Sequence, residues 1–393
     1  MSKNNNMKFF RIEYDINPVR HIDHLESIKE EWMAVHKESR LQSPLLSFEY
    51  IQLWYTCFAS PDQVRVYIAF DEGNAIGFLP LILCKEKGVR ILKGLSNDYC
   101  CHCAHLCRKG DEIQFSELIL NVLLKDRHEW DVLNFNFLYS FSDCPDLFSD
   151  SLLDNMGLHW NKIIRPTYSV FLGKPFDNYI RNDISANYRK HLKQFTKRLK
   201  KSGNYTFKYY QGEGALKLWH EFVRIEDSGW KGALNSSIKR TKPVVKKYYE
   251  EFIKILSDKK ALRIYFLELN DELIAGGFGY FQGDTYHYEK SGYDEEYKRL
   301  SPSNLLFIHM VEQLISNWPQ ITRIHMFPWS YGYKDRLINE ESNYLETVIF
   351  SNTLRGLVMR VVYSLKEKIK KIKKRLNLKR ENSPEGYRIW KSN

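Results

Sequence analysis

The segment that most constrains the fold covers residues 271–314, which contain two strand patterns followed by a helix pattern. Residues 273–281 are apolar and rich in glycine, and Gly283-Asp284 is a pair typical of hairpin turns. Residues 285–293 then alternate in polarity, as a strand does. The segment therefore predicts a β-hairpin that leads through a short loop into a helix.

The alternation assigns the side chains of the second strand to two faces. Tyr286 and Tyr288 share one face, whereas His287, Glu289 and Ser291 share the other. Because a histidine can exchange protons near neutral pH, His287 and its neighbour Glu289 are candidate catalytic residues. The alternative for His287 is a satisfied position within a tyrosine-rich sheet.

The helix expected after this hairpin begins at Ser301-Pro302-Ser303-Asn304, where proline suits the first turn. Backbone N–H groups at such a helix start attract anions, so we expect it to bind the diphosphate of an acyl carrier such as coenzyme A. An ordinary capped helix is the alternative. The expected diphosphate ligands are Ser301, Ser303, Asn304 and Leu305, with Lys298 and Arg299 nearby.

The length of 393 residues predicts two domains, and 43% hydrophobic residues are enough to form their cores. No apolar run is long enough for a transmembrane helix, and the first residues lack the apolar core of a signal peptide. We therefore expect a cytoplasmic protein.

The net charge of +11 is concentrated at the end of the chain. Residues 351–393 hold 13 Lys and Arg against 3 Asp and Glu, which leaves the rest of the chain at only +1. A nucleic-acid binder with a basic surface throughout is therefore not expected.

The basic tail also has an apolar helical stripe, so we expect an amphipathic helix there. Its first turns should pack on the catalytic body, and its later turns should project toward an anionic membrane. A solvated helix is the alternative. The stripe comprises Leu354, Leu357, Val358, Val361, Val362, Leu365, Ile369, Ile372 and Leu376.

Cysteine and histidine gather at residues 100–107, but the spacing does not suit a metal. A structural zinc site needs a second pair of ligands well downstream, and none follows. We therefore expect no metal, and a buried strand of small residues instead.

The chain uses one order of elements twice. Asp71, Glu72, Gly77 and Phe78 recur as Asp271, Glu272, Gly277 and Phe278, each time between two strand patterns. Strands are expected at 7–14, 64–70, 75–84, 89–95, 130–138, 160–172, 205–210, 262–269, 321–327 and 346–351, and helices at 21–38, 48–58, 115–124, 145–156, 188–199, 215–225 and 243–256.

Three segments in this order resemble the CelD-type, FemAB-like branch of the GNAT acyltransferase superfamily: IEDSGWKGALNSSI (225–238), KSGYDEEYKRLSPSNLL (290–306) and FPWSYGYKDRL (327–337). The basic helix pattern YRKHLKQFTKRLKKSG (188–203) matches the segment before the catalytic half in that branch. The chain departs from the branch at Ser303, where relatives often have Gly, and at Trp329-Ser330, where they have Gly-Asp.

The resemblance implies an α/β fold of tandem GNAT-like domains, each a twisted mixed sheet flanked by helices. The expected divisions are an N-terminal, degenerate domain at 1–165, a catalytic domain at 166–350 and a basic tail at 351–393. It also implies transfer of an acyl group, in the first instance acetyl, from acyl-CoA to an amine of a small molecule or of a surface-polysaccharide precursor. The alternatives are an aminoacyl-tRNA-dependent ligase and a non-catalytic module docked at a membrane.

Acyl transfer to an amine needs a positioned base, and Glu226 and Asp227 are candidates besides His287 and Glu289. The resemblance adds four substrate-side residues: Trp230, Lys231, Tyr333 and Lys334. A core position for Trp230 and a solvated one for Lys334 are the alternatives. The basic residues of 189–201 would suit charged tRNA, but most such runs are simply solvated.

Overall fold

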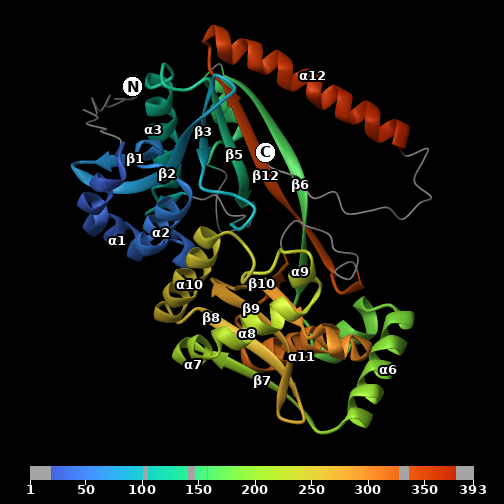
Figure 1. Cartoon of the computed structure of the whole chain (residues 1–393). Coiled ribbons are helices and arrows are strands. Elements are labelled where there is room, and N and C mark those ends of the chain that lie inside the picture. Colours follow the sequence, from blue (N-terminus) through green and yellow to red (C-terminus); the bar gives the residue numbers. More distant parts are fainter. Residues whose placement is uncertain (1–18, 101–104, 140–146, 157, 327–335, 378–393) are drawn as a thin grey trace, which may run out of the picture.

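The computed structural model describes residues 19–100, 105–139, 147–156, 158–326 and 336–377 (Figure 1). The first expected strand, at 7–14, lies outside the described residues. The fold is mixed α/β, and its two halves share the plan that the family resemblance implies.

The strands form one sheet in the order β1-β2-β3-β5-β12-β6-β11-β10-β9-β8-β7, with β4 paired to β2. Their bounds are β1 Val64–Asp71, β2 Asn74–Glu86, β3 Val89–Gly94, β4 Leu106–Cys107, β5 Val132–Tyr139, β6 His159–Phe171, β7 Tyr205–Gln211, β8 Leu262–Leu269, β9 Glu272–Gln282, β10 Thr285–Tyr293, β11 Arg323–His325 and β12 Glu340–Phe350.

Helices cover both faces of this sheet (Figure 1). The α-helices are α1 Lys29–Glu38, α2 Phe48–Phe58, α3 Glu112–Lys125, α4 Asp150–Asn155, α5 Phe176–Asn178, α6 Ala186–Ser202, α7 Gly212–Lys217, α8 Trp219–Ser228, α9 Trp230–Ala233, α10 Pro243–Asp258, α11 Pro302–Asn317 and α12 Leu354–Asn377. Tighter or wider turns occur at η1 Ile22–Ile28, η2 Pro44–Leu46, η3 Pro61–Gln63, η4 Tyr179–Asp183 and η5 Glu295–Leu300.

The two halves repeat one supersecondary plan. In the first half, β1, β2 and β3 are antiparallel neighbours, and α3 crosses over to β5, which is parallel to β3. In the second half, β8, β9 and β10 repeat that arrangement, and α11 crosses over to β11, which is parallel to β10. A parallel pair needs such a crossover because a tight turn can only join antiparallel strands.

The halves exchange their last strands. Strand β6 follows the first half but pairs with β11 of the second, whereas β12 follows the second half and pairs with β5 of the first. The two exchanged strands also pair with each other from His159 to Ser169. The strands of the two halves therefore form one continuous sheet. The division at residue 165 stays a prediction, and β6 runs across it.

The repeated Asp-Glu sequence lies at a hairpin turn in both halves, but in a different register. In the first half, Glu72 and Gly73 occupy the turn, with φ of 47° and 81°. In the second, Asn270 and Asp271 occupy it, with φ of 51° and 65°. Both turns need two residues at positive φ, which matches the twist of the flanking strands.

The largest core joins the halves on one face of the sheet, where α2 of the first half packs on α10 of the second. Tyr50 contacts Phe252 with ring centroids 5.5 Å apart, and Phe58 contacts Tyr248 at 5.0 Å. A second core lies under α6 and α11 on the other face. The site described below faces the shared core.

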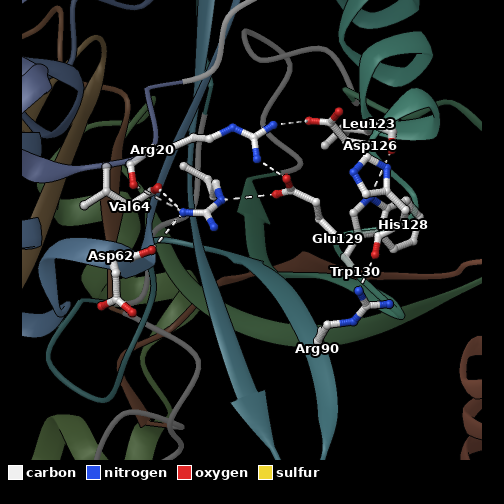
Figure 2. A network of polar contacts seen from close by, with 10 residues as sticks. Arg20, Asp62, Val64, Arg90, Leu123, Asp126, His128, Glu129 and Trp130 are labelled. Carbon is white, nitrogen blue, oxygen red and sulfur yellow. Dashed lines mark hydrogen bonds and ion pairs between the residues drawn. The ribbon is translucent and has the colours of Figure 1, made fainter.

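A polar network holds the first half together near the start of the described chain (Figure 2). The Arg20 guanidinium pairs with Asp126 and Glu129, which follow α3, and Arg65 also reaches Glu129 at 3.5 Å. The Trp130 indole donates to the Leu123 carbonyl at 2.9 Å. These contacts fix the connection between α3 and β5.

Several expected elements differ in length. Strand β11 covers only three residues of the expected 321–327, while β12 begins six residues before the expected 346. The helix expected at 145–156 shortens to α4. The helix expected at 215–225 is interrupted at Leu218, which separates α7 from α8.

The first turns of the tail helix contact the last strand before it. Helix α12 packs through Met359 and Tyr363 on Val348 and Phe350 of β12, which lies within the expected catalytic domain at 166–350, and also on Val132 of β5 in the first half. Residues 378–393 lie outside the described chain.

Candidate active site

A β-bulge shapes the second strand of the central hairpin. Tyr288 of β10 pairs with Gly279, and Lys290 pairs with the next residue, Phe278, so Glu289 is the extra residue between them. A bulge places two neighbouring side chains where a regular strand would place one. The side chains of Glu289 and Lys290 both interact with residues on the face of the sheet that α8, α9 and α10 cover.

A buried carboxylate joins this bulge to α8. The Glu226 side chain is completely buried, and its Oε1 lies 3.2 Å from Nζ of Lys231 and 3.8 Å from Nζ of Lys290. Its Oε2 accepts from the backbone N–H of Ile238 at 2.9 Å. Burial opposes the charge, but Lys231, Lys290 and the Ile238 N–H hold the pKa of Glu226 below its ordinary value.

The two lysines lie between two acids. Lys231 also donates to the Ser291 carbonyl at 2.8 Å, and Lys290 lies over the ring of Tyr249, 5.1 Å from its centroid. Burial lowers the pKa of Lys231, and the Glu226 carboxylate opposes that shift. Both lysines keep about a fifth of their side-chain surface exposed, 19% for Lys231 and 20% for Lys290. Each lysine therefore contacts both the buried Glu226 carboxylate and solvent.

Of the two acids in this cluster, Glu289 has fewer interactions that stabilise its charged form. Burial raises its pKa to about 7, while the positive charges of Lys290 and Lys231 act in the opposite direction. Its side chain remains partly exposed. A carboxyl group with a pKa near 7 is suited to accept a proton at physiological pH.

The strand and the helix that carry these groups approach closely because of two glycines. A Cβ on Gly292 of β10 would lie 2.6 Å from Cα of Glu226, and one on Gly229 would lie 2.9 Å from the Tyr293 carbonyl oxygen. Real side chains do not tolerate such distances, so glycine at these positions lets α8 and α9 lie directly on β10.

The first half contributes to the same side of the sheet. The Tyr248 hydroxyl on α10 lies 3.1 Å from the Tyr50 hydroxyl, which in turn lies 2.8 Å from Sγ of Cys100. Burial raises the pKa of Tyr248 well above its ordinary value, with smaller contributions from Tyr50, Cys100 and Glu289. The phenols therefore stay protonated, and they join Cys100 to Tyr248, whose hydroxyl senses the charge of Glu289.

His287 lies deeper in the sheet than Glu289. It is 1% exposed and stacks on Tyr280, with ring centroids 4.9 Å apart. The ring of His325 lies edge-on at 5.3 Å, and its Nε2 is 2.7 Å from Oγ1 of Thr167. These contacts match the sheet-residue alternative for His287.

Asp227 and Trp230 lie at the rim of the cluster. The Asp227 carboxylate pairs with Arg240 at 2.7 Å and accepts from Ser237 at 2.7 Å, which holds its pKa below the ordinary value. Trp230 is 42% exposed, with Nζ of Lys231 5.9 Å from its ring centroid. Asp227 therefore organises the loop after α9, and Trp230 presents an aromatic face to solvent.

The expected diphosphate loop lies immediately after the bulged strand. Ser301 caps α11 with φ of 52°, an unfavourable value for a residue with a side chain. Its carbonyl accepts from the N–H groups of Asn304 at 3.1 Å and Leu305 at 3.3 Å, and the Ser303 hydroxyl donates to the Gly292 carbonyl at 3.4 Å. Lys298 and Arg299 are both exposed.

Basic helix α6 borders this loop. The guanidinium of Arg198 donates to the Arg299 carbonyl at 3.2 Å, and α6 packs on both η5 and α11. Its exposed cations are Lys190, Lys193, Lys197, Arg198, Lys200 and Lys201. An anion at the start of α11 would therefore lie in a positive field.

The described pairing of β10 with β11 stops at His287, and residues 327–335 lie outside the described chain. Their pairing ends at His287 and His325, whereas β10 continues to Tyr293. Within the described residues, the bulge thus has a partner strand on the β9 side alone. The candidates Tyr333 and Lys334 lie outside the described residues.

The structure brings Glu226, Glu289 and Lys231 together, and adds three residues that the sequence did not single out. Lys290 follows the bulge, which a polarity pattern does not reveal, and Tyr50 and Tyr248 read only as apolar-face residues of helices. Among the described residues, no three His, Cys, Asp or Glu side chains are arranged to hold a metal ion, and no helix is both long and apolar enough to cross a membrane.

Comparison with known proteins bears directly on this second half. Residues 186–335 match the model of the acetyltransferase (GNAT) domain family. The chain contains a GNAT domain. The GNAT domain includes the bulge, the lysines and the loop before α11, and the protein is an acyltransferase of the GNAT type. No curated protein sequence matches the chain.

Solved structures share the fold at low sequence identity. FemX aligns with a TM-score of 0.52 and 13% identity over 85% of this chain and 98% of that one. The C-terminal domain of an Agrobacterium fabrum protein, provisionally described as a lysylphosphatidylglycerol synthetase, aligns with a TM-score of 0.51 and 12% identity over 85% and 95%. These likenesses cover both halves, so the tandem arrangement occurs in other proteins.

Proposed function

We propose that this GNAT protein transfers an acyl group from acyl-CoA to an amine, with Glu289 as the general base. The observation that carries the proposal is the carboxyl group of Glu289 at the β-bulge, with a pKa of about 7. It lies near two lysines, on the strand that leads into the loop before α11. Acetyl is the first acyl group to test. An amino sugar of a surface-polysaccharide precursor is the acceptor class that the family resemblance suggests.

In this proposal, the donor diphosphate lies at the start of α11 beside Lys298 and Arg299, where the helix dipole and these cations attract it, since the N–H groups of Asn304 and Leu305 already donate to the Ser301 carbonyl. The exposed cations of α6 support an anionic donor there. The open stretch of β10 beyond His287 would receive the thioester arm, since within the described chain it lacks a strand on that side.

The chemistry then needs one proton acceptor. The neutral acceptor amine attacks the thioester carbonyl, and its proton passes to the Glu289 carboxylate. The C–S bond then breaks to expel CoA thiolate, which takes the proton from Glu289 to leave as the thiol and restores the carboxylate. Lys231 and Lys290 keep a fraction of Glu289 ionised near pH 7, because their charges oppose the effect of burial. Glu226 in turn holds both lysines in place.

A second donor class is favoured by the cationic face of α6. Six exposed basic side chains beside the donor loop would also suit the phosphates of an aminoacyl-tRNA. The near-neutral charge of residues 1–350 points instead to a small anionic donor. The two donors make different predictions about salt, because release of many counterions makes tRNA binding strongly salt-dependent.

The test begins with thermal denaturation of the full chain with acetyl-CoA, longer acyl-CoAs or charged tRNA. Acyl-CoA should raise the melting temperature, and Glu289→Gln should bind it equally well. In a panel of amines, Glu289→Gln should release CoA thiol about 10²–10⁴-fold more slowly than the wild type.

The matched control is Glu250→Gln, which neutralises a partly exposed carboxylate on α10. It should leave thiol release unchanged. Protection by charged tRNA alone would overturn the acyl-CoA proposal in favour of the second donor. Protection by acyl-CoA with full activity in Glu289→Gln would remove Glu289 as the base.

A further inference from the structure

The last helix turns its apolar side away from the protein. Helix α12 packs on the sheet through Met359 and Tyr363, and Gly356 is buried on the same side. At 100° per residue, these three positions fall within one arc, and the apolar stripe falls on the opposite one. In Figure 1, α12 extends outward beyond the strands that it contacts.

The exposure of that stripe is extensive. Among its residues, Leu354 is 80% exposed, Val361 is 59% exposed and Ile372 is 55% exposed. The large apolar side chains exposed along α12 are Leu354, Leu357, Val358, Val361, Leu365, Ile369 and Ile372. A continuous apolar surface of this kind on a water-facing helix marks an interaction site.

The charge of the helix restricts what can cover it. Residues 354–377 include nine Lys and Arg and one Glu, so the segment carries +8. Arg360, Lys366 and Lys368 are described as exposed. The covering partner must therefore offer both an apolar interior and a negative surface.

We infer that α12 lies in the surface of an anionic lipid bilayer, with its apolar stripe among the acyl chains and its cations among the headgroups. A second copy of the chain would bring +8 against +8, which opposes pairing of two such helices. A nucleic acid would satisfy the charge but leave the stripe in water. No described helix is long and apolar enough to cross a membrane, and in this inference α12 lies along the membrane surface.

The experiment is sedimentation of the full-length protein with vesicles of phosphatidylcholine alone or with added phosphatidylglycerol. We expect binding only to the anionic vesicles, weakening as salt rises. The double variant Lys366→Gln/Lys368→Gln should bind about 30-fold more weakly, at about fivefold per lysine. Leu365→Glu/Ile369→Glu should lose binding by more than a hundredfold.

The matched control is Ile113→Glu, since Ile113 is a 79% exposed apolar residue on α3, away from the stripe. It should bind as the wild type does, and circular dichroism should show all variants folded. Equal binding of the wild type and Leu365→Glu/Ile369→Glu would overturn the inference. So would concentration-dependent dimers, or co-purifying RNA, that disappear in that variant while vesicle binding is absent.

Discussion

At the scale of single residues, the site depends on how two glutamates and two lysines lie close together. Glu226 is ionised because three donors surround it, whereas Glu289 faces the same lysines with fewer hydrogen bonds. Two carboxyl groups held by one pair of lysines therefore have pKa values on opposite sides of the ordinary one. This separation suits the proposed roles, in which Glu226 is a structural anion and Glu289 is the base.

The titration of Glu289 is a direct prediction. Its pKa should be near 7 in the wild type, so the carboxylate fraction, and with it amine acylation, should rise as pH increases through about 7. Lys290→Met removes a charge that lowers this pKa and should raise it by about one unit. The measurement is a pH titration of ¹³C-labelled glutamate side chains by NMR.

Lys246→Met is the control for this titration, because Lys246 is an exposed residue of α10. It should leave the Glu289 midpoint where it is. A wild-type midpoint near the ordinary glutamate value, or a downward shift in Lys290→Met, would contradict the assignment.

At the scale of elements, the bulge of β10 and the absence of a Cβ on Gly292 act together. The bulge turns Glu289 and Lys290 to one side, and Gly292 lets α8 approach that side until Glu226 meets the lysines. The geometry of the cluster is thus set by backbone contact between a strand and a helix. Side-chain chemistry alone would not bring these groups together.

Gly292→Ala tests this arrangement. The new methyl group would clash with backbone atoms of Glu226, so α8 must move away, and we expect a loss of about 1–3 kcal/mol in the free energy of unfolding. The displaced Glu226 should also slow acyl transfer. Urea denaturation measures the first effect, and CoA thiol release measures the second.

Gly214→Ala is the matched comparison, since Gly214 lies in α7 and a Cβ there meets nothing within 4 Å. Alanine favours a helix over glycine, so this variant should gain up to about 1 kcal/mol. If both variants changed stability in the same direction, the close approach at Gly292 would not be the constraint proposed here.

At the scale of the whole molecule, the exchanged strands β6 and β12 make each half incomplete without the other. The shared core between α2 and α10 adds a second connection on one face of the sheet. Neither half can close its own sheet from its own sequence. We therefore expect the tandem halves to unfold as one cooperative unit.

Calorimetry of the full chain should accordingly show a single transition. Leu92→Ala in β3 and Leu267→Ala in β8 each empty a fully buried site and should each lower that transition, at a cost of about 2–5 kcal/mol. Two transitions, with each substitution moving only one of them, would show that the halves unfold independently.

Local sequence patterns determined the element types over most of the described chain. The hairpin of β9 and β10, the helix after Ser301 and the order of elements in the two halves all follow from hydrophobic period and turn residues, which act over a few positions. The pairing of Glu226 with Lys231 joins residues five apart, one near the end of α8 and one in α9.

Tertiary structure alone decided the rest. The exchange of β6 and β12 depends on pairing between residues that lie 171 to 191 positions apart, from the pair Ser169 and Glu340 to the pair His159 and Phe350, for which no local pattern exists. The bulge at Glu289 is a property of how β10 aligns with β9, because a polarity pattern does not show an extra residue. The sequence also did not show which side of α12 faces solvent. A helix with one apolar stripe ordinarily buries that stripe, but here Met359 and Tyr363 on the opposite side pack on the sheet and the stripe stays exposed.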